Sequence, residues 1–396
     1  MSTYLERAKA MQDRLVAIRR DLHMHPELSF NEVRTAKKVT ENLDELGIEY
    51  TTGVAKTGVV GHLGDGGPVV ALRADMDALP IVEANEVPYK SLNPGVMHAC
   101  GHDAHVTCLL GAATMLAEDF KAGRLQGTVR LLFQPSEEAW DAELKSGGRR
   151  MVEEGALEGT DAVFGLHVIS TDPSNVVFTR GGDFMAAVDS FYGKVIGRGG
   201  HGAYPHEALD PVWIAANVVN AIHGIVSRRT NPVENGLISV TMIHAGTASN
   251  IIPPEVTLAG TIRSFKPEVR KQLHEDLERA FSVARAFGGD YDLKIQIGYP
   301  PTVNNPALAQ FVGETATNLI GADNVRGADL EMGAEDFSYM LQAKPGAFFY
   351  LGAKKDNVDR QHHAPDFDID ESVLVTGAAL MAEVARKYLT DKPASQ

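Results

Sequence analysis

The order of the predicted elements changes between Asp189 and Ile297, and this change most constrains the fold of the chain. Apolar alternation predicts strands over 191–196, 237–244, 256–265 and 291–297, and helical periodicity fills 211–226 and 267–287. The resulting order is β-α-β-β-α-β, a split βαβ unit of ferredoxin-like type that can bury its own core. We therefore expect a domain over 189–298, inserted into a first domain formed by 1–188 and 299–396.

The flanking sequence alternates apolar runs with helical stretches. Short apolar runs over 59–63, 69–72, 129–133 and 163–168 predict strands, and 104–121 predicts a helix. A further strand over 347–351 and a helix over 373–388 close the chain. Near the start, Pro26 predicts that one helix ends and that another begins near Ser29. The expected fold class is α/β, with helices covering both faces of a mixed sheet.

Composition narrows the class of partner and the compartment. The formal net charge of −15 argues against nucleic acid or an anionic membrane as the main partner. The two cysteines, Cys100 and Cys108, are too few for a disulfide framework. The first residues lack the apolar core of a signal peptide, and no apolar run is long enough to span a bilayer. These features predict a cytoplasmic protein.

The densest polar cluster lies over 98–105 and holds three histidines, Cys100 and Asp103. Desolvating so many polar groups without partners costs about 1–3 kcal/mol for each group. A bound metal offsets this cost, because thiolate and imidazole both favour borderline transition ions. The alternative is a polar helix N-terminus capped by Asp103. Taken singly, His98 or His105 is better explained as a structural residue than as a ligand.

Two adjacent carboxylates, Glu137 and Glu138, lie in the segment 134–138, which directly follows the apolar run 129–133. In open α/β sheets the binding crevice lies beyond the carboxyl ends of the strands. One carboxylate at such a place can bind a cation while its neighbour acts as a general base on a metal-bound water. A solvated acidic turn is the alternative for an isolated pair. The position after a buried strand and the nearby Cys/His cluster favour the functional interpretation.

Other polar residues repeat this placement at strand ends. His167 ends the run 163–168, Asp75 follows the run 69–72, and His362 and His363 lie in a turn far downstream. Each is a weak signal alone, because a single histidine at a strand end is usually structural. Together with Cys100, His102 and Glu138 they supply enough ligands for two ions at one edge of the sheet.

The inserted segment carries its own polar positions. His201 lies in the glycine-rich turn 197–202, which lacks the Lys-Ser/Thr of a P-loop, so we discount a nucleotide. Asn250 and Arg263 each place a hydrogen-bond donor near a strand or loop end. On their own they are better explained as turn chemistry and as a surface charge.

Taken in order, the motifs resemble those of hippurate hydrolase and the bacterial N-acyl-L-amino-acid amidohydrolases. The plant hydrolases of indoleacetyl-amino-acid conjugates are similar, and aminoacylase and carboxypeptidase G are more distant. The similarity runs from about Ile18 to the C-terminal helix. The segments that carry it are 100–103, 135–138, 165–167, the glycine turn around His201, and 363–365.

This resemblance implies a catalytic domain with two divalent ions (Zn, Mn, Co or Ni) and an inserted lid that forms a homodimer or homotetramer. The implied metal ligands are Cys100, His102, Glu138, His167 and His363. Glu137 would be the general base and Asp75 the orienting aspartate, although Arg73 stands where distant relatives have a histidine. His201 would stabilise the oxyanion, from the partner subunit. Asn250 and Arg263 would hold the substrate carboxylate.

The resemblance further implies hydrolysis of small N-acyl-L-amino acids, such as N-acetyl, N-benzoyl or indoleacetyl conjugates, to a carboxylate and a free amino acid. An exopeptidase or dipeptidase of the same fold is the first alternative, because the two differ only in what lies on the acyl side. A relative without catalytic activity is the second, and the presence of Glu137 argues against it.

Overall fold

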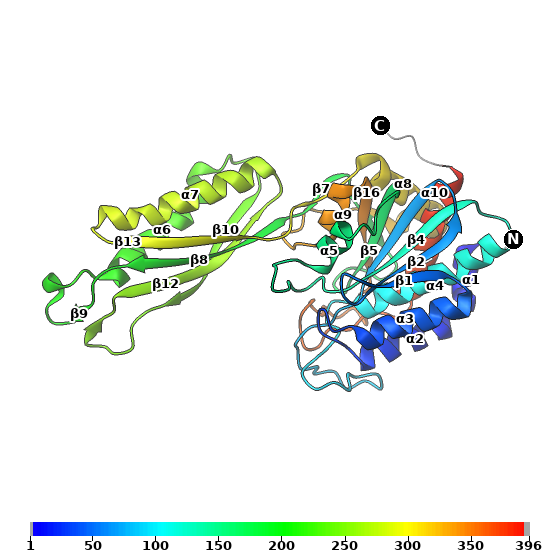
Figure 1. Cartoon of the computed structure of the whole chain (residues 1–396), viewed down its shortest axis with the longest axis horizontal. Coiled ribbons are helices and arrows are strands. Elements are labelled where there is room, and N and C mark those ends of the chain that lie inside the picture. Colours follow the sequence, from blue (N-terminus) through cyan, green and yellow to red (C-terminus); the bar gives the residue numbers. More distant parts are fainter. Residues whose placement is uncertain (1–2, 392–396) are drawn as a thin grey trace. The chain divides into compact units, whose positions relative to one another are not determined.

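The computed structural model describes residues 3–391, which form two compact units. The first unit comprises the chain up to Gly182, Val303–Asp329, and the chain from Asp336 onward. The second comprises Asp183–Thr302 and Leu330–Glu335. In Figure 1 the second unit is the green-to-yellow segment with its own sheet and helices.

The first unit is built on an eight-stranded sheet with the order β1-β2-β4-β3-β5-β16-β6-β15. Strands β4, β3, β5 and β16 are parallel to one another, whereas β2 is antiparallel to β4 and β6 to β16. The predicted mixed α/β sheet is confirmed. The strand bounds are β1 Glu49–Val54, β2 Gly58–Asp65, β3 Val69–Asp75, β4 Gly127–Gln134, β5 Ala162–Ile169, β6 Val177–Thr179, β15 Val325–Gly327 and β16 Gly346–Gly352.

The helices of this unit are α1 Tyr4–Ala10, α2 Gln12–Met24, α3 Val33–Leu46, α4 His102–Lys121, α5 Gly147–Glu153, α8 Pro306–Ile320, η2 Ala322–Asn324, α9 Phe337–Ala343 and α10 Val373–Thr390. The expectation that the second helix begins near Ser29 is wrong, because α3 begins at Val33. The Glu27 carboxylate accepts hydrogen bonds from the amides of Arg34 and Thr35 at 3.0 and 2.8 Å, which fixes the later start. No helix within residues 3–391 has the length and apolar character needed to cross a bilayer.

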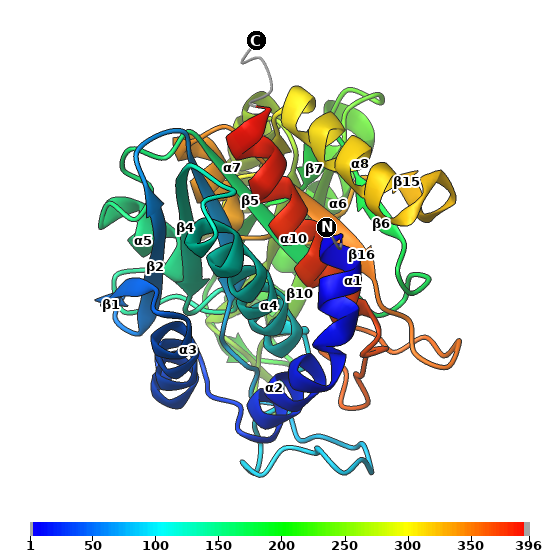
Figure 2. The same ribbon diagram turned by 90° about the vertical axis from the view of Figure 1, so that its right-hand side faces the viewer.

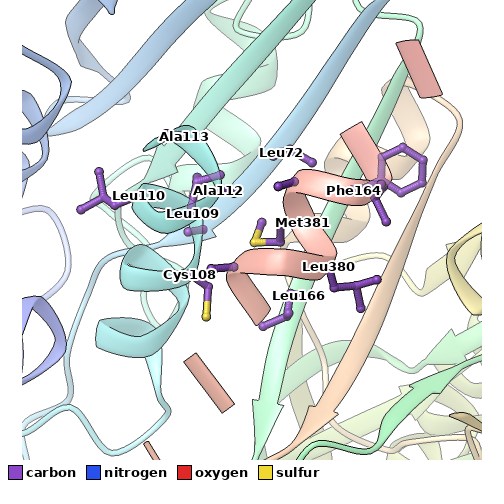
Figure 3. Close-up of a cluster of buried hydrophobic side chains, with 14 of the residues drawn as sticks. Leu72, Cys108, Leu109, Leu110, Ala112, Ala113, Phe164, Leu166, Leu380 and Met381 are labelled. Atoms are coloured by element: carbon purple, nitrogen blue, oxygen red, sulfur yellow. The ribbon is translucent and has the colours of Figure 1, made fainter. Parts of the chain in front are cut away.

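Helices α4 and α10 pack against each other and against β3, and they form the centre of the core (Figure 2). Figure 3 shows Cys108 of α4 and Met381 of α10 among side chains of the sheet. The two helices approach closely at a glycine, since a Cβ added to Gly377 would meet the Cys108 sulfur at 2.5 Å. Cys108 is therefore a core residue, and burial raises the pKa of its thiol to about 12.

The second unit has a four-stranded antiparallel sheet in the order β10-β12-β8-β13. Its main elements follow the chain as β8 Ala187–Ile196, α6 Pro211–Arg229, β10 Gly236–His244, β12 Glu255–Ser264, α7 Pro267–Ala286 and β13 Asp290–Ile297, so the β-α-β-β-α-β order is confirmed. Alternate residues of β12 are buried, and Phe191, Leu258 and Phe281 belong to a separate apolar core. The remaining short elements are β7 Gly182–Met185, β9 Gly200–His201, η1 Pro205–Glu207, β11 Ile251–Ile252 and β14 Thr302–Asn304.

Candidate metal centre

The candidate ligands of the first unit lie at the carboxyl ends of its parallel strands. Asp75 ends β3, Glu137 and Glu138 follow β4, and His167 lies near the end of β5. Cys100 and His102 lie at the start of α4, which packs on β3. Because parallel strands end at one edge of a sheet, residues far apart in the sequence meet there.

Cys100 is shared by two groups of candidate ligands. Its sulfur lies within 4.8 Å of donor atoms of His102 and Glu138, and within the same distance of donor atoms of His167 and His362. The Cys100 Sγ to His167 Nε2 distance is 3.5 Å. His363 joins the first group, because its Nε2 lies 3.1 Å from Glu138 Oε1. The predicted ligands of the first unit are thus brought together, and the sulfur lies between two groups of donors.

The Nε2 atoms of His102 and His167 both lie within this cluster, and that of His167 contacts Cys100 Sγ. The Nδ1–H of His102 donates to the Asp77 carbonyl at 2.8 Å, and the Nδ1–H of His167 donates to the Val168 carbonyl at 2.7 Å. In the neutral form of each ring, the form that binds a metal, the lone pair is therefore on Nε2. Metal-binding histidines commonly use the other ring nitrogen in this way, which fixes the tautomer and the ring orientation.

His105 and His362 have the opposite tautomer. The Nε2 of His105 accepts from the Val168 amide at 2.9 Å, and the Nε2 of His362 accepts from the Ser170 amide at 3.3 Å. Burial lowers the pKa of both rings, so each is neutral and carries its proton on Nδ1. His105 then donates to Asp75 Oδ1 at 2.6 Å, and His362 donates toward Cys100 Sγ at 3.6 Å. These two rings support the centre and offer no lone pair to it.

The donor set fits a pair of divalent cations. The Nε2 of His102 is buried and has no hydrogen-bond partner in the structure, and it lies 4.0 Å from Glu138 Oε1. Burial would lower the pKa of His102, but the carboxylates of Asp75, Asp77 and Glu138 raise it to about 10. Burial and the carboxylates of Glu138 and Glu137 raise the pKa of the Cys100 thiol well above its usual range. A bound cation would neutralise this negative pocket and hold Cys100 as thiolate.

Asp75 is held in its ionised form by Arg73. The guanidinium is fully buried and donates from Nη1 to Asp75 Oδ2 at 2.7 Å, from Nε to Gln134 Oε1 at 2.9 Å, and from Nη2 to Asp336 Oδ1 at 3.1 Å. Burial alone would raise the pKa of Asp75, but Arg73, His102 and His105 hold it well below its usual range. Arg73 therefore supplies a permanent cation beside Asp75.

The two glutamates differ in exposure and contacts. Glu137 is buried, and its Oε1 accepts from the Asp336 amide at 3.4 Å, whereas Glu138 faces His102 and His363. The preceding residue, Ser136, has a φ of 47°, a left-handed conformation that is strained for a residue with a Cβ. Such strain is frequent where a loop must aim functional side chains.

The three predicted residues of the second unit lie at two separate places. His201 of β9 is paired with Ile251 of β11, and the Gly202 amide donates to the Asn250 carbonyl at 2.8 Å, so His201 and Asn250 are exposed neighbours. Arg263 lies near the other end of β12, where it donates to the Met332 carbonyl at 3.1 Å. At about 3.3 Å per residue, the strand from Glu255 to Arg263 spans roughly 26 Å.

Several residues of the centre were not found by sequence analysis. Asp336 binds Arg73 across 263 positions, and the Asp77 carboxylate contacts the backbone of the two glutamates. Asp336 follows no apolar strand, so no positional signal marks it. Asp77 could have been found, because it directly extends the strand-end motif of Asp75.

Comparison with known proteins supports this centre. Residues 71–387 match the peptidase family M20/M25/M40. The chain is 43% identical to thermostable carboxypeptidase 2 of Saccharolobus solfataricus (96% of each chain), and 41% identical to IAA-amino acid hydrolase ILR1-like 4 of Arabidopsis thaliana (97% of this chain, 87% of that one). The crystal structure of the YXEP protein of Bacillus subtilis, a dinuclear metal-binding peptidase, is 35% identical, with a TM-score of 0.83 over 96% of this chain and 99% of that one.

The comparisons and the geometry agree on the type of protein. A dinuclear relative of the same fold and the two donor groups around Cys100 point to a centre for two divalent ions. The resemblance drawn from the motifs is confirmed, and so is the assignment as a hydrolase. The chain belongs to the peptidase family M20/M25/M40.

Proposed function

We propose that the protein hydrolyses the amide bond of small N-acyl-L-amino acids, hippurate-like, N-acetyl or indoleacetyl conjugates, to a carboxylate and a free amino acid. The observation that carries the proposal is the donor cluster around Cys100 with the buried Glu137 beside it. The 41% identity to an IAA-amino acid hydrolase supports the substrate class.

The candidate ligands Cys100, His102, Glu138, His167 and His363 would hold the ions. When bound, the ions polarise the amide carbonyl and acidify the attacking water. Glu137 takes the proton of that water on its carboxylate and passes it to the leaving amine. Asp75 is fixed by Arg73 and His105, and it orients the candidate ligands that lie beside it.

The proposed metal is a borderline divalent ion: Zn, Mn, Co or Ni. A buried thiol, imidazole nitrogens and a carboxylate form a donor set that suits such ions better than Mg or Ca, which prefer oxygen ligands. Reconstitution of chelator-treated protein with each ion in turn, followed by assay, would identify the ion that supports the highest kcat/KM.

We further propose that the segment 189–298 is a lid that pairs two chains into a homodimer, or a homotetramer built from such dimers. Strand β10 is an edge of its sheet and exposes Met242 and Ile243 by 50% and 55%. A small substrate also cannot touch Asn250 and Arg263 of one chain, since they are separated by most of β12. In a dimer, His201 and Asn250 of one chain would complete the site of the other.

The trans arrangement is tested by mixing two inactive proteins, Glu137→Gln and His201→Ala, under conditions that exchange subunits. Activity should recover in part, because one of the two mixed sites keeps both residues. The control is a mixture of Glu137→Gln with Asp75→Asn. Both residues lie in the first unit of one chain, so each mixed site keeps one defect and activity should not recover. Failure to recover despite proven exchange would contradict a trans-acting His201.

An exopeptidase activity is the second candidate, supported by the 43% identity to a carboxypeptidase. One assay separates the two: initial rates on hippurate, N-acetyl amino acids and indoleacetyl conjugates against dipeptides of the same C-terminal residue. We expect higher kcat/KM for the N-acyl compounds. A preference for dipeptides with a free amino group would favour the exopeptidase. The cytoplasmic location stays a prediction of the sequence.

A further inference from the structure

Three consecutive backbone amides at the two glutamates are held by two buried carboxylates. The Ser136 amide donates to Glu32 Oε1 at 2.8 Å. The Glu137 and Glu138 amides donate to Asp77 Oδ1 and Oδ2, each at 3.0 Å. Glu32 is 0% exposed and Asp77 is 1% exposed, so no bulk water competes for these bonds.

Each carboxylate is itself fixed by neighbouring groups. Glu32 Oε1 also accepts from the Phe30 amide at 2.9 Å, and its Oε2 accepts from the Thr57 hydroxyl. Asp77 Oδ2 accepts from the Ser29 hydroxyl at 2.6 Å. The positions of both carboxylates are therefore fixed. They in turn fix the strained Ser136 conformation, because Glu32 bonds the Ser136 amide and Asp77 bonds the next amide along the chain.

Asp77 also reaches a candidate metal ligand. Its backbone carbonyl accepts the Nδ1–H of His102, which leaves His102 Nε2 free for the cluster. One residue thus fixes the tautomer of His102 through its main chain, and the direction of Glu137 and Glu138 through its side chain.

We propose that Glu32 and Asp77 are positioning residues for the hydrolysis. By accepting hydrogen bonds from the backbone amides of residues 136–138, they orient the general base Glu137 and the neighbouring candidate ligand Glu138. The proposal rests on the function proposed above for its catalytic readout. It predicts different behaviour for the two acids. Asp77 accepts from the amides of both glutamates and should affect metal affinity and kcat. Of these three amides Glu32 bonds only that of Ser136, so it should affect mainly kcat.

The hydrogen-bond pattern distinguishes conservative variants. Both oxygens of Asp77 face backbone N–H donors, so an Asn at this position must turn an NH₂ group against one of them. In Glu32 one oxygen accepts from the amides of Phe30 and Ser136, and the other accepts from the Thr57 hydroxyl, which can reverse and accept instead. Gln should therefore replace Glu32 well, and Asn should replace Asp77 poorly.

The experiment compares zinc-loaded wild type with Asp77→Asn, Glu32→Gln and Glu32→Ala. Three readouts are measured: hydrogen exchange of a peptide spanning residues 136–138, zinc affinity by competition with a chelator, and kcat and KM for hippurate. The control is Glu154→Ala, because Glu154 is exposed and accepts from the amide of Ala55 (φ 51°), another strained residue, at 2.7 Å. It should match wild type in all three readouts.

We expect Asp77→Asn to lose protection from hydrogen exchange at residues 136–138. Its zinc affinity and its kcat should each fall by about 10–100-fold, while its KM should stay within about 2-fold of the wild-type value. Glu32→Ala should lose protection and kcat, and Glu32→Gln should restore most of both. Wild-type protection and zinc affinity in Asp77→Asn would overturn the proposal, as would equal losses in the two Glu32 variants. If Asp77→Asn does not fold, the Glu32 pair decides. A wild type inactive on hippurate, N-acetyl and indoleacetyl conjugates alike refutes the proposed function, while hydrogen exchange and zinc affinity still test the positioning roles of Glu32 and Asp77.

Discussion

The Nδ1 atom of His105 lies 2.6 Å from Asp75 Oδ1, and the far nitrogen of the same ring accepts from the Val168 amide. Both ring nitrogens are therefore in use, although His105 lies within 4.8 Å of His102 donor atoms. His102 and His167 each bond a backbone carbonyl through Nδ1 alone, which leaves Nε2 among the candidate ligands. The backbone groups around each ring thus separate candidate ligands from supporting residues.

This separation predicts the metal content of four histidine variants. His102→Ala and His167→Ala should each lose metal, because a free Nε2 is removed from the cluster. His105→Ala and His362→Ala should keep both ions but bind them more weakly, by about 10-fold, since they act on Asp75 and Cys100. Metal analysis after gel filtration measures the outcome. Full metal loss in His105→Ala would place that ring among the ligands.

Cys100 is expected to be essential for metal retention. Dialysis against a chelator should abolish activity, and Cys100→Ser should lower metal affinity, because a hydroxyl is a poorer ligand than thiolate for a borderline ion. Cys108→Ser is the matched control, since Cys108 lies in the core and contacts α10 instead. Metal-free protein with full activity would contradict the metal centre.

The adjacent glutamates should separate in their effects. Glu137→Gln should keep its ions and lose about 10²–10⁴-fold in kcat, the usual contribution of a general base. Glu138→Gln should lose metal, because Glu138 Oε1 faces His102 and His363. Both variants are assayed for metal content and kcat. Identical metal content with identical activity losses would refute the division of roles.

Glu32 should make the stability of the metal-free protein depend on pH. Burial, together with the charge of Asp77, raises the pKa of Glu32 from 4.5 to about 7. Between these values only the unfolded state loses its proton, so folding stability falls as pH rises, and the full penalty remains above pH 7. Glu32→Gln lacks this penalty. In urea unfolding, the free energy of unfolding of Glu32→Gln minus that of wild type should rise by on the order of 3 kcal/mol from pH 4.5 to pH 8. A constant difference would show that Glu32 ionises normally.

Arg263 should select for a free carboxylate on the substrate. Its guanidinium is partly exposed and can form two parallel hydrogen bonds to a carboxylate. A bound substrate with an amide in that place would desolvate the charge and leave it unpaired, at a cost of roughly 2–5 kcal/mol. Hippurate should therefore exceed hippuramide in kcat/KM by about 30-fold or more in wild type. The preference should shrink in Arg263→Ala. Equal kcat/KM for both compounds in wild type would exclude carboxylate anchoring.

The predicted fold is most accurate where strands are buried on both faces. The runs that became β4, β5 and β16 are mostly apolar, and each was predicted. Strand β1 was missed because most of its residues are exposed and Thr51 and Thr52 weaken the apolar pattern. Helix α8 was missed although it carries a start signal, Asn305 as N-cap followed by Pro306.

The candidate ligands of the site were predictable from the sequence. Motifs and strand ends identified the groups that converge on Cys100, because each lies beside a recognisable strand or helix. The contacts that fix those groups were not predictable. Glu32 meets Ser136 across 104 positions, and Arg73 meets Asp336 across 263, so only the folded chain brings them together. The tautomers of the histidines depend on backbone groups, which a sequence pattern does not mark.

Strand β16 lies between β5 and β6, although some 170 residues separate it from both along the chain. A growing polypeptide therefore leaves the edge of β5 unpaired until Gly346–Gly352 has been made, and β6 has no inner neighbour before then. His167 is ready early, but His363 follows β16 and comes last. The complete set of candidate ligands is therefore present only near the end of translation, after both β16 and His363 have been made.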